Sequence, residues 1–132
     1  MIENVVWLLP EIVPAIHNRQ ISEHGGSDGI RDEGLLASAL ARPQNLNAYG
    51  DDVDFAALAA SYAFGIAKNH PFIDGNKRTA LVVMRTFLAL NDVEFVATQE
   101  EKYLKILGLA EGSVDEEDLA EWIRSKSSEP NK

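Results

Sequence analysis

The sequence predicts an all-α protein, folded as a compact bundle of about six helices. Apolar residues recur at helical spacing through most of the chain, and residues that start or stop helices separate these stretches. The alternation of apolar and polar residues that is typical of strands occurs only in the short VEFV at 93–96. These observations leave little room for a sheet.

Prolines, glycines and an acidic cap define the first two predicted helices. One helix is expected at about 11–24, although Pro10 and Pro14 both suit its first turn. A glycine-rich stretch then interrupts the chain, and Asp32 can cap a second helix. Pro43 is expected to end that helix, because proline lacks the backbone N–H and clashes with the preceding turn.

The third predicted helix is expected at the centre of the fold. It covers 55–69 after a cap at Asp54, and it ends before Pro71 because the residue preceding proline is driven out of the helical region. Its small Ala, Ser and Gly residues allow close packing. The remaining expected helices are 76–91, one opened by a capping box of Thr98 and Glu101, and one opened by Ser113 and the acids at 115–118.

Composition limits the class of protein. The chain has 132 residues, which suits a single domain over 1–132, with a flexible tail at about 126–132. It contains no cysteine, so a disulfide framework and a thiolate zinc site are excluded. No apolar run approaches the roughly 20 residues of a membrane span, and no signal-peptide pattern opens the chain. We therefore expect a cytoplasmic protein with no membrane partner.

Charge is unevenly distributed along the chain. The formal net charge of −9 argues against direct nucleic-acid binding, which needs clustered Lys and Arg. Between 68 and 85, however, four basic residues accompany a single acid, whereas 100–121 holds eight acids and two lysines. An acidic protein with one basic region suits a small anion better than a polymer.

The stretch HPFIDGNKR at 70–78 concentrates residues that suit phosphate binding. Gly75 and Asn76 stand at the predicted start of a helix, where free backbone N–H groups and the helix dipole attract anions. Lys77 and Arg78 follow in the first turn. Two cations beside the positive end of the dipole are unfavourable, and a bound polyphosphate would offset that cost.

Two side chains that precede this helix, those of Asp74 and His70, suit the chemistry of group transfer. Asp74 can hold a magnesium ion that bridges phosphate oxygens, and His70 can accept a proton from an attacking hydroxyl. With the phosphate cradle, they predict transfer of a phosphoryl or nucleotidyl group. The structural alternative is a simple turn in which His70 caps the preceding helix and the cations are solvated, but that alternative explains none of the spacing.

HPFIDGNKR resembles the motif of the Fic family, HxFx[DE]GN followed by a variable position and Arg. Its lysine before Arg78 is similar to the death-on-curing (Doc) branch. The resemblance extends over roughly 7–125, including EHGGSDGIRDEGLLASALARPQ and LAASYAFGIAKNHPFIDGNKRTAL. It implies the Fic/Doc fold and the role of toxin in a bacterial toxin–antitoxin pair. The implied partner is a small antitoxin whose C-terminal helix lies in an apolar groove of the toxin.

The resemblance also implies roles at matching positions. His70 becomes the base that acts on a target hydroxyl, Phe72 the core anchor of the loop, and Asp74 the magnesium ligand. The implied phosphate cradle consists of Gly75, Asn76, Lys77 and Arg78.

Two positions bear on which group is transferred. AMP-transferring Fic proteins usually have Gly where Lys77 stands and a second Arg where this chain has Leu81. The Doc-like branch instead implies transfer of the γ-phosphate of ATP to a Ser/Thr hydroxyl of a protein such as a translation elongation factor, which arrests translation. AMP transfer is the chemical alternative. A non-catalytic module that binds a nucleotide or a partner is another, although binding alone needs no base.

Residues outside the motif receive secondary interpretations. PQNLNAYGDD at 43–52 is expected to be a loop, and Gln44 and Tyr49 are candidates for a flap that holds the target peptide as an added strand. His17 and His24, near the first helix, are expected to be surface or capping histidines.

Many Fic proteins carry an inhibitory helix of the form [ST]xxxE[GN]. In this chain Pro130 follows the candidate at 125–129, and Asp118 follows the candidate at 113–117, so neither matches. Restraint is therefore expected to come from a separate antitoxin.

Overall fold

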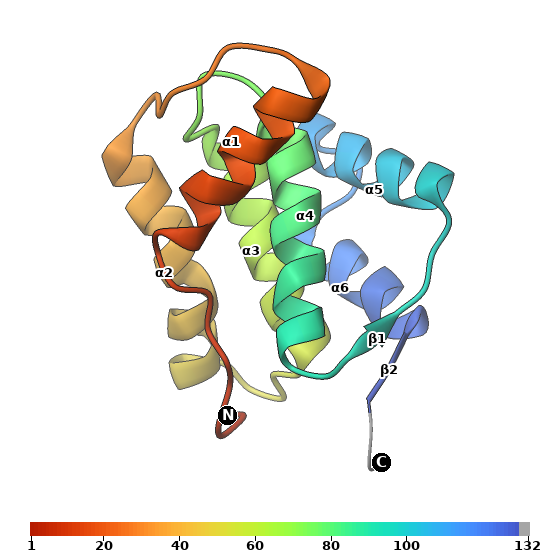
Figure 1. The fold of residues 1–132 in the computed structure, drawn as a ribbon. Helices are drawn as coiled ribbons and strands as arrows, with labels where there is room; N and C mark the ends of the chain where they lie inside the picture. The colour runs from red at the N-terminus through yellow and green to blue at the C-terminus, as the bar shows by residue number, and fades with distance from the viewer. Residues whose placement is uncertain (130–132) are drawn as a thin grey trace.

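The computed structural model describes residues 1–129 and confirms the all-α class, with six helices and one small sheet in this range (Figure 1). Strands β1 (Glu94–Phe95) and β2 (Ser127–Ser128) pair antiparallel, with Glu94 opposite Ser128. None of the helices described is both long and apolar enough to cross a membrane. The helices are α1 (Ile12–His24), α2 (Glu33–Tyr49), α3 (Phe55–Asn69), α4 (Asn76–Leu90), α5 (Gln99–Glu111) and α6 (Glu116–Ser125).

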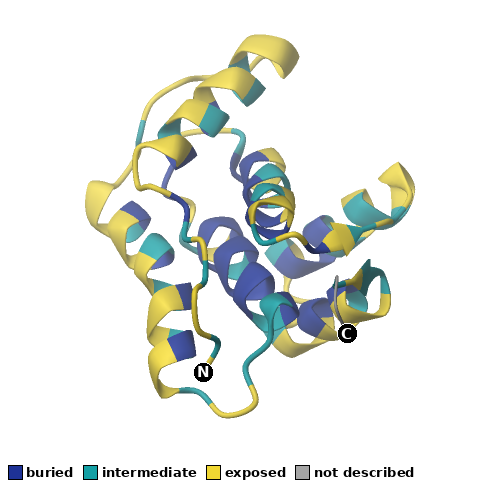
Figure 2. Ribbon diagram, turned by 60° about the horizontal axis from the view of Figure 1, so that its bottom comes forward, coloured by how far each residue is buried: buried dark blue, intermediate teal, exposed yellow. Residues whose placement is uncertain are grey.

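Helix α3 forms the centre of the molecule, as predicted. It packs against α2, α4, α5 and α6, while α1 packs against α4. Figure 2 shows the buried residues gathered in the interior and the exposed ones on the outer faces of the surrounding helices. Small side chains allow this close packing: a Cβ on Gly65 would lie 3.1 Å from the Cα of Ala39 on α2. The turn that follows α3 is therefore anchored to the most buried part of the fold.

The prediction that Pro43 ends the second helix was wrong. Helix α2 continues through Pro43 to Tyr49, so most of the expected loop at 43–52 is helical. Asn47, one turn beyond the proline, is buried; its amide donates to the Ile2 carbonyl at 2.9 Å, and its Oδ1 accepts from the Ile2 N–H at 2.8 Å. Packing on α3 and this clamp hold the helix together despite a proline penalty of about 3 kcal/mol.

The start of α6 also differs from the prediction. The N-cap is Asp115, whose carboxylate accepts from the Asp118 N–H at 2.7 Å. Ser113 does not open this helix; its hydroxyl instead donates to the Gly108 carbonyl of α5 at 3.4 Å. The capping box at Thr98 and Glu101 is confirmed.

The expected flexible tail at 126–132 is partly ordered. Ser127–Ser128 form β2, and the Val96 N–H donates to the Lys126 carbonyl at 2.9 Å. Residues 127–128 therefore have a backbone partner in β1, the short strand that precedes α5. The part of the predicted tail at 130–132 lies outside the described residues.

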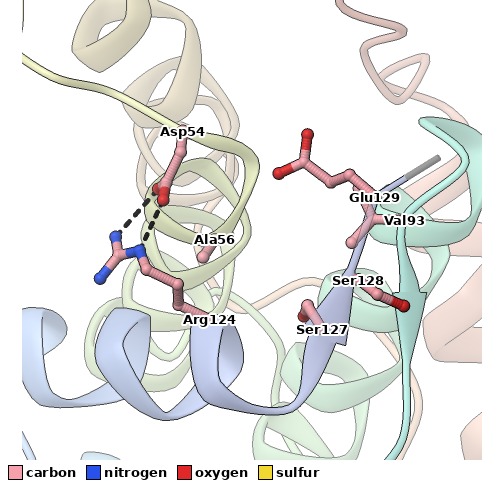
Figure 3. Close-up of a pocket in the computed structure, with 7 residues that line it drawn as sticks. All are labelled: Asp54, Ala56, Val93, Arg124, Ser127, Ser128 and Glu129. Atoms are coloured by element: carbon pink, nitrogen blue, oxygen red, sulfur yellow. Dashed lines mark hydrogen bonds and ion pairs between the residues drawn. The ribbon is translucent and has the colours of Figure 1, made fainter. Parts of the chain in front are cut away.

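Asp54 joins two elements around α3. It caps α3 by accepting from the Ala57 N–H at 2.9 Å, and it pairs with both Nε and a terminal nitrogen of Arg124 on α6, at 2.6 and 3.0 Å (Figure 3). Burial acts to raise the pKa of the Asp54 carboxyl. The hydrogen bonds from Arg124 and Ala57 outweigh burial and hold the pKa below its ordinary value. The carboxylate is therefore stabilised in its charged form.

Replacing Asp54 should separate its two roles. We expect Asp54→Ala to lower the free energy of unfolding by about 1–2 kcal/mol, because it loses the cap and the ion pair. Asp54→Asn keeps a capping side chain and should lose about 0.5–1 kcal/mol. Urea unfolding at pH 7 measures both changes.

The same variants give a pH test. Because the folded-state pKa of Asp54 is depressed, its contribution is present above the unfolded pKa, about 3.9, and is lost as the pH falls through the folded value. The gap between the wild-type protein and Asp54→Asn should therefore shrink from pH 7 to pH 3. An equal gap at both values would contradict the assigned ion pair.

Candidate active site

The motif at 70–78 forms the turn between the two central helices α3 and α4 (Figure 1). His70 is the C-cap of α3 and has a left-handed backbone, with φ of 49° and ψ of 57°. Arg31 holds this backbone, donating from Nε to the His70 carbonyl and from a terminal nitrogen to the Asn69 carbonyl, both at 2.7 Å. The His70 side chain is exposed, and no hydrogen bond described in 1–129 uses its ring. The ring is thus free to act while its backbone is restrained.

Phe72 anchors the turn in the core, as the resemblance implies. Its side chain is 1% exposed and stacks on the ring of His17, with centroids 3.9 Å apart. Asn76 closes the turn on itself: its Oδ1 accepts from the Phe72 N–H at 3.0 Å, and its Nδ2 donates to the Phe72 carbonyl at 2.9 Å. Both the oxygen and the nitrogen of the Asn76 side-chain amide therefore bond within the turn, which leaves the backbone N–H of Asn76 to face an anion.

The segment before α2 lies alongside the turn like a short strand. Ile30 pairs antiparallel with Phe72. The Ile73 N–H donates to the Gly29 carbonyl at 3.1 Å, and the Arg31 N–H donates to the Pro71 carbonyl at 2.7 Å. These bonds come from a segment outside α3 and α4. The conformation of the turn therefore does not depend on its local sequence alone.

Asp74 presents a restrained but accessible carboxylate. Its Oδ1 accepts from the Gly75 N–H at 2.9 Å, and its Oδ2 accepts from the Ser27 N–H at 3.3 Å. The residue is exposed, and each oxygen keeps a free lone pair. No group of three or more metal-binding side chains occurs in the described part of the chain. A single carboxylate nevertheless fits magnesium, which completes its shell with phosphate oxygens and water.

Helix α4 begins without a side-chain cap or an acid in its first turn. Gly75, its N-cap, has φ of 75°, a conformation that glycine adopts without strain. The first helical bond runs from the Thr79 N–H to the Gly75 carbonyl, so the N–H groups of residues 76–78 have no helical partner. Helices α2, α3, α5 and α6 all have side-chain caps. The start of α4 is therefore open to an anion.

A cleft of about 880 Å³ opens beside this helix start, within the size range of small-molecule sites. Lys77, Arg78 and Arg85 line it, and none of them forms an ion pair among residues 1–129. Burial lowers the pKa of the neighbouring Lys102 ammonium, and the charge of Arg85 lowers it further. Leu81, Val82, Ile106 and Leu107 provide an apolar wall. Three cations without ion pairs thus share one cleft of an acidic protein with two acids, Glu23 and Asp74.

The predicted site residues are only partly brought together. Residues 74–78 all line the cleft, whereas His70 does not. Gln44 and Tyr49 are exposed on α2 and do not line it either. Their placement in a loop was wrong, because α2 extends through them, although a role in target docking is left as a prediction.

His17 and Arg31 were missed as site residues. The expectation that His17 is a surface or capping histidine was wrong, since its side chain is 1% exposed against Phe72. A signal was present: Val13, His17 and Ile21 recur at four-residue spacing, which places His17 on the apolar line of its helix. Arg31 has no such local signal, because its partners lie 38 and 39 residues away.

The fold and the cleft define a helical protein in which the turn between α3 and α4 leads into an uncapped helix start beside a cleft lined by cations. The chain belongs to the Fic/DOC family, whose model matches residues 7–88. It is 34% identical over 115 residues to "Protein kinase doc" of Escherichia phage P1, covering 87% of this chain and 90% of that protein. It is also 45% identical over 76 residues to "Toxin Doc" of Mycolicibacterium smegmatis, covering 55% of this chain and 57% of that relative.

The unpaired cations should bind a polyphosphate without any reaction. We expect Arg78→Gln and Arg85→Gln each to weaken binding of inorganic triphosphate by about tenfold, because each removes a charge-assisted hydrogen bond. Lys68→Gln, on an exposed residue of α3 outside the cleft lining, is the matched control and should bind like the wild-type protein. Isothermal titration calorimetry measures all three, and equal losses in the control would contradict a specific site.

Proposed function

We propose that this chain is a Doc-like toxin that transfers the γ-phosphate of ATP to a Ser/Thr hydroxyl of a protein. One observation carries the proposal: the uncapped start of α4 opens into a cleft with three unpaired cations, directly after Asp74. Four of the other five helices have side-chain caps; α1 also lacks one, but its first turn does not line the cleft, so only the uncapped start of α4 coincides with the motif. Free N–H groups and cations together suit a triphosphate.

Each residue of the turn would have a defined task. The N–H groups of 76–78 and the side chains of Lys77 and Arg78 hold the triphosphate. Magnesium bound at Asp74 would supply neutralisation of the charge on the phosphate oxygens. His70 accepts the proton of the target hydroxyl while that oxygen bonds to the γ-phosphorus. The bond from phosphorus to the bridging oxygen breaks, and ADP leaves.

Two further features support transfer over binding alone. His70 has an exposed ring on a restrained backbone, an arrangement that a general base can use and a binding module does not need. The phage P1 relative, which aligns over nearly its whole length, is named a protein kinase. Lys77 stands where AMP-transferring members usually have Gly, and Leu81 where they have a second Arg.

The transferred group and the base are tested together. We expect purified protein to label a protein in a bacterial lysate from γ-labelled ATP and not from α-labelled ATP. His70→Asn should reduce labelling by about 10²–10⁴-fold, because it removes the base while Asn tolerates the left-handed backbone. ATP affinity, measured by calorimetry, should stay within a few-fold of the wild-type value.

The other outcomes each decide something. Label from α-labelled ATP would replace phosphate transfer with AMP transfer. No label from either, with intact ATP binding, would favour a non-catalytic nucleotide-binding module. Labelling by His70→Asn at near the wild-type rate would remove His70 from the role of base.

The proposed partners follow from the same assignment. The protein target is a translation component such as an elongation factor, and a small antitoxin is the regulator. Because the inhibitory pattern is unmatched in the sequence, restraint by a separate chain is consistent with the cleft being open in the structure. The antitoxin would bind through a helix whose few apolar anchor residues enter a groove of the toxin.

Expression in bacteria tests the toxin assignment. We expect the wild-type protein alone to slow growth by arresting translation, followed by incorporation of a labelled amino acid, and His70→Asn to be harmless. Co-expression of the small open reading frame next to its gene should restore growth. Unimpaired growth with soluble, folded wild-type protein would remove the toxin assignment and leave the chemistry to the labelling experiment.

A further inference from the structure

We infer that His17 is a positioning residue for Asp74: it sets the orientation of the peptide between Asp74 and Gly75, and through that peptide it orients the carboxylate. The expected effect of His17 on magnesium binding rests on the proposed use of Asp74 as the metal ligand. Its effect on the conformation of the turn does not depend on that proposal. His17 lies on α1, more than 50 residues before the motif, and it does not line the cleft beside α4.

His17 contacts the turn in two ways. Its ring stacks almost parallel on Phe72, at 5° between the planes. Its Nε2 lies 2.7 Å from the backbone oxygen of Asp74. A carbonyl oxygen only accepts hydrogen bonds, so Nε2 must carry the proton and donate. No other described donor reaches this oxygen.

The bond to this carbonyl fixes a whole peptide plane. In a planar trans peptide, the carbonyl of one residue and the N–H of the next point in opposite directions. With the Asp74 carbonyl held toward His17, the Gly75 N–H must point away from it. That N–H donates to Oδ1 of Asp74 at 2.9 Å. His17 therefore acts on the carboxylate through a single rigid peptide.

Gly75 makes this restraint necessary. Glycine populates positive and negative φ about equally, so the turn alone does not select one orientation of the preceding peptide. A reversed peptide would turn the Asp74 carbonyl away from His17 and would remove the N–H that now donates to Oδ1 of Asp74. Glycine also suits the close approach of α1, because a Cβ here would lie 3.1 Å from Cδ1 of Ile21 and that side chain would have to shift. Gly75 thus lets α1 approach the turn. It also leaves the peptide between Asp74 and Gly75 free to reverse unless His17 holds it.

The carboxylate is confined from a second direction. A Cβ on Gly26 would lie only 2.8 Å from Oδ2 of Asp74, and the Ser27 N–H donates to the same oxygen at 3.3 Å. The carboxylate therefore lies between the turn's own N–H and the segment after α1. Its two oxygens are positioned by elements that His17 and its helix bring together.

Two substitutions distinguish hydrogen bonding from packing. His17→Phe keeps a ring that can stack on Phe72 but loses the donor. His17→Gln loses the ring but places an N–H donor at about the position of Nε2. If His17 only fills space, the Phe variant should behave more like the wild-type protein. If it positions the peptide, the order is reversed, and the Gln variant retains the properties of the turn.

Hydrogen exchange tests the positioning without any nucleotide. We expect the amides of 73–76 to exchange about three- to tenfold faster in His17→Phe than in His17→Gln or the wild-type protein, the change expected for one lost hydrogen bond. Peptides from α6 serve as an internal control and should not change. Equal exchange at 73–76 in the two variants, or faster exchange in His17→Gln, would overturn the inference.

The wild-type protein provides a measurement that needs no variant. Nitrogen NMR of the His17 ring should show a proton on Nε2, and this proton should exchange slowly with water. A proton on Nδ1 with an unprotonated Nε2 would contradict the hydrogen bond. This result decides the inference even where His17→Phe fails to fold.

Magnesium binding then tests the consequence for Asp74. In calorimetric titrations of ATP, we expect His17→Phe to need about three- to tenfold more magnesium for half-maximal binding, and His17→Gln to match the wild-type protein. An unchanged magnesium requirement in His17→Phe, with faster exchange at 73–76, would overturn the link to Asp74. A wild-type protein that binds no magnesium–ATP would instead overturn the proposed function, and the exchange and NMR results would still decide the role of His17 in the turn.

Discussion

The burial of Phe72 is the constraint on which the geometry of the site depends. This side chain is enclosed between His17 and the core, and both backbone polar groups of the same residue are bonded by Asn76. The start of α4 is thereby tied to the end of α3 across four residues. With Phe72 held in the interior, Asp74 and the first turn of α4 must lie at the surface beside the cleft.

The helices differ in how their first turns are stabilised. Four helices have side-chain caps, and α5 and α6 have full capping boxes. In the first turn of α4 the sequence instead places two cations, Lys77 and Arg78, where they oppose the helix dipole. A chain selected for stability alone would place an acid there. The local cost is consistent with a site that a bound anion completes, which is where violations of local rules are expected.

The restraints on the turn come from three residues outside the two helices that it connects. Arg31 holds the backbone at the end of α3, Gly29 bonds to the residue before Asp74, and His17 holds the carbonyl of Asp74 itself. All three precede α2 in sequence. The N-terminal part of the molecule therefore acts as the support of a site to which it contributes few cleft residues, and substitutions there are expected to affect the site through the turn.

Much of the local structure could be predicted because short-range chemistry determines it. The cap at Asp54, the helix at 55–69, the capping box at Thr98 and the open helix start after Gly75 all depend on residues within one turn of each other. The motif likewise identified residues 74–78, which the structure places together along one cleft. The sequence by itself determined the helical class, the acidic charge and the family motif.

Only the tertiary structure decided the features that depend on distant contacts. Pro43 lies inside a helix because packing on α3 and the Asn47 clamp outweigh its local preference. Ser127–Ser128 are ordered because β1, more than 30 residues earlier, offers a backbone partner. His17 is buried rather than exposed because Phe72 and the Asp74 carbonyl contact it from the turn between α3 and α4. In each case a free energy summed over long-range contacts exceeds a local preference, and no short stretch of sequence contains that sum.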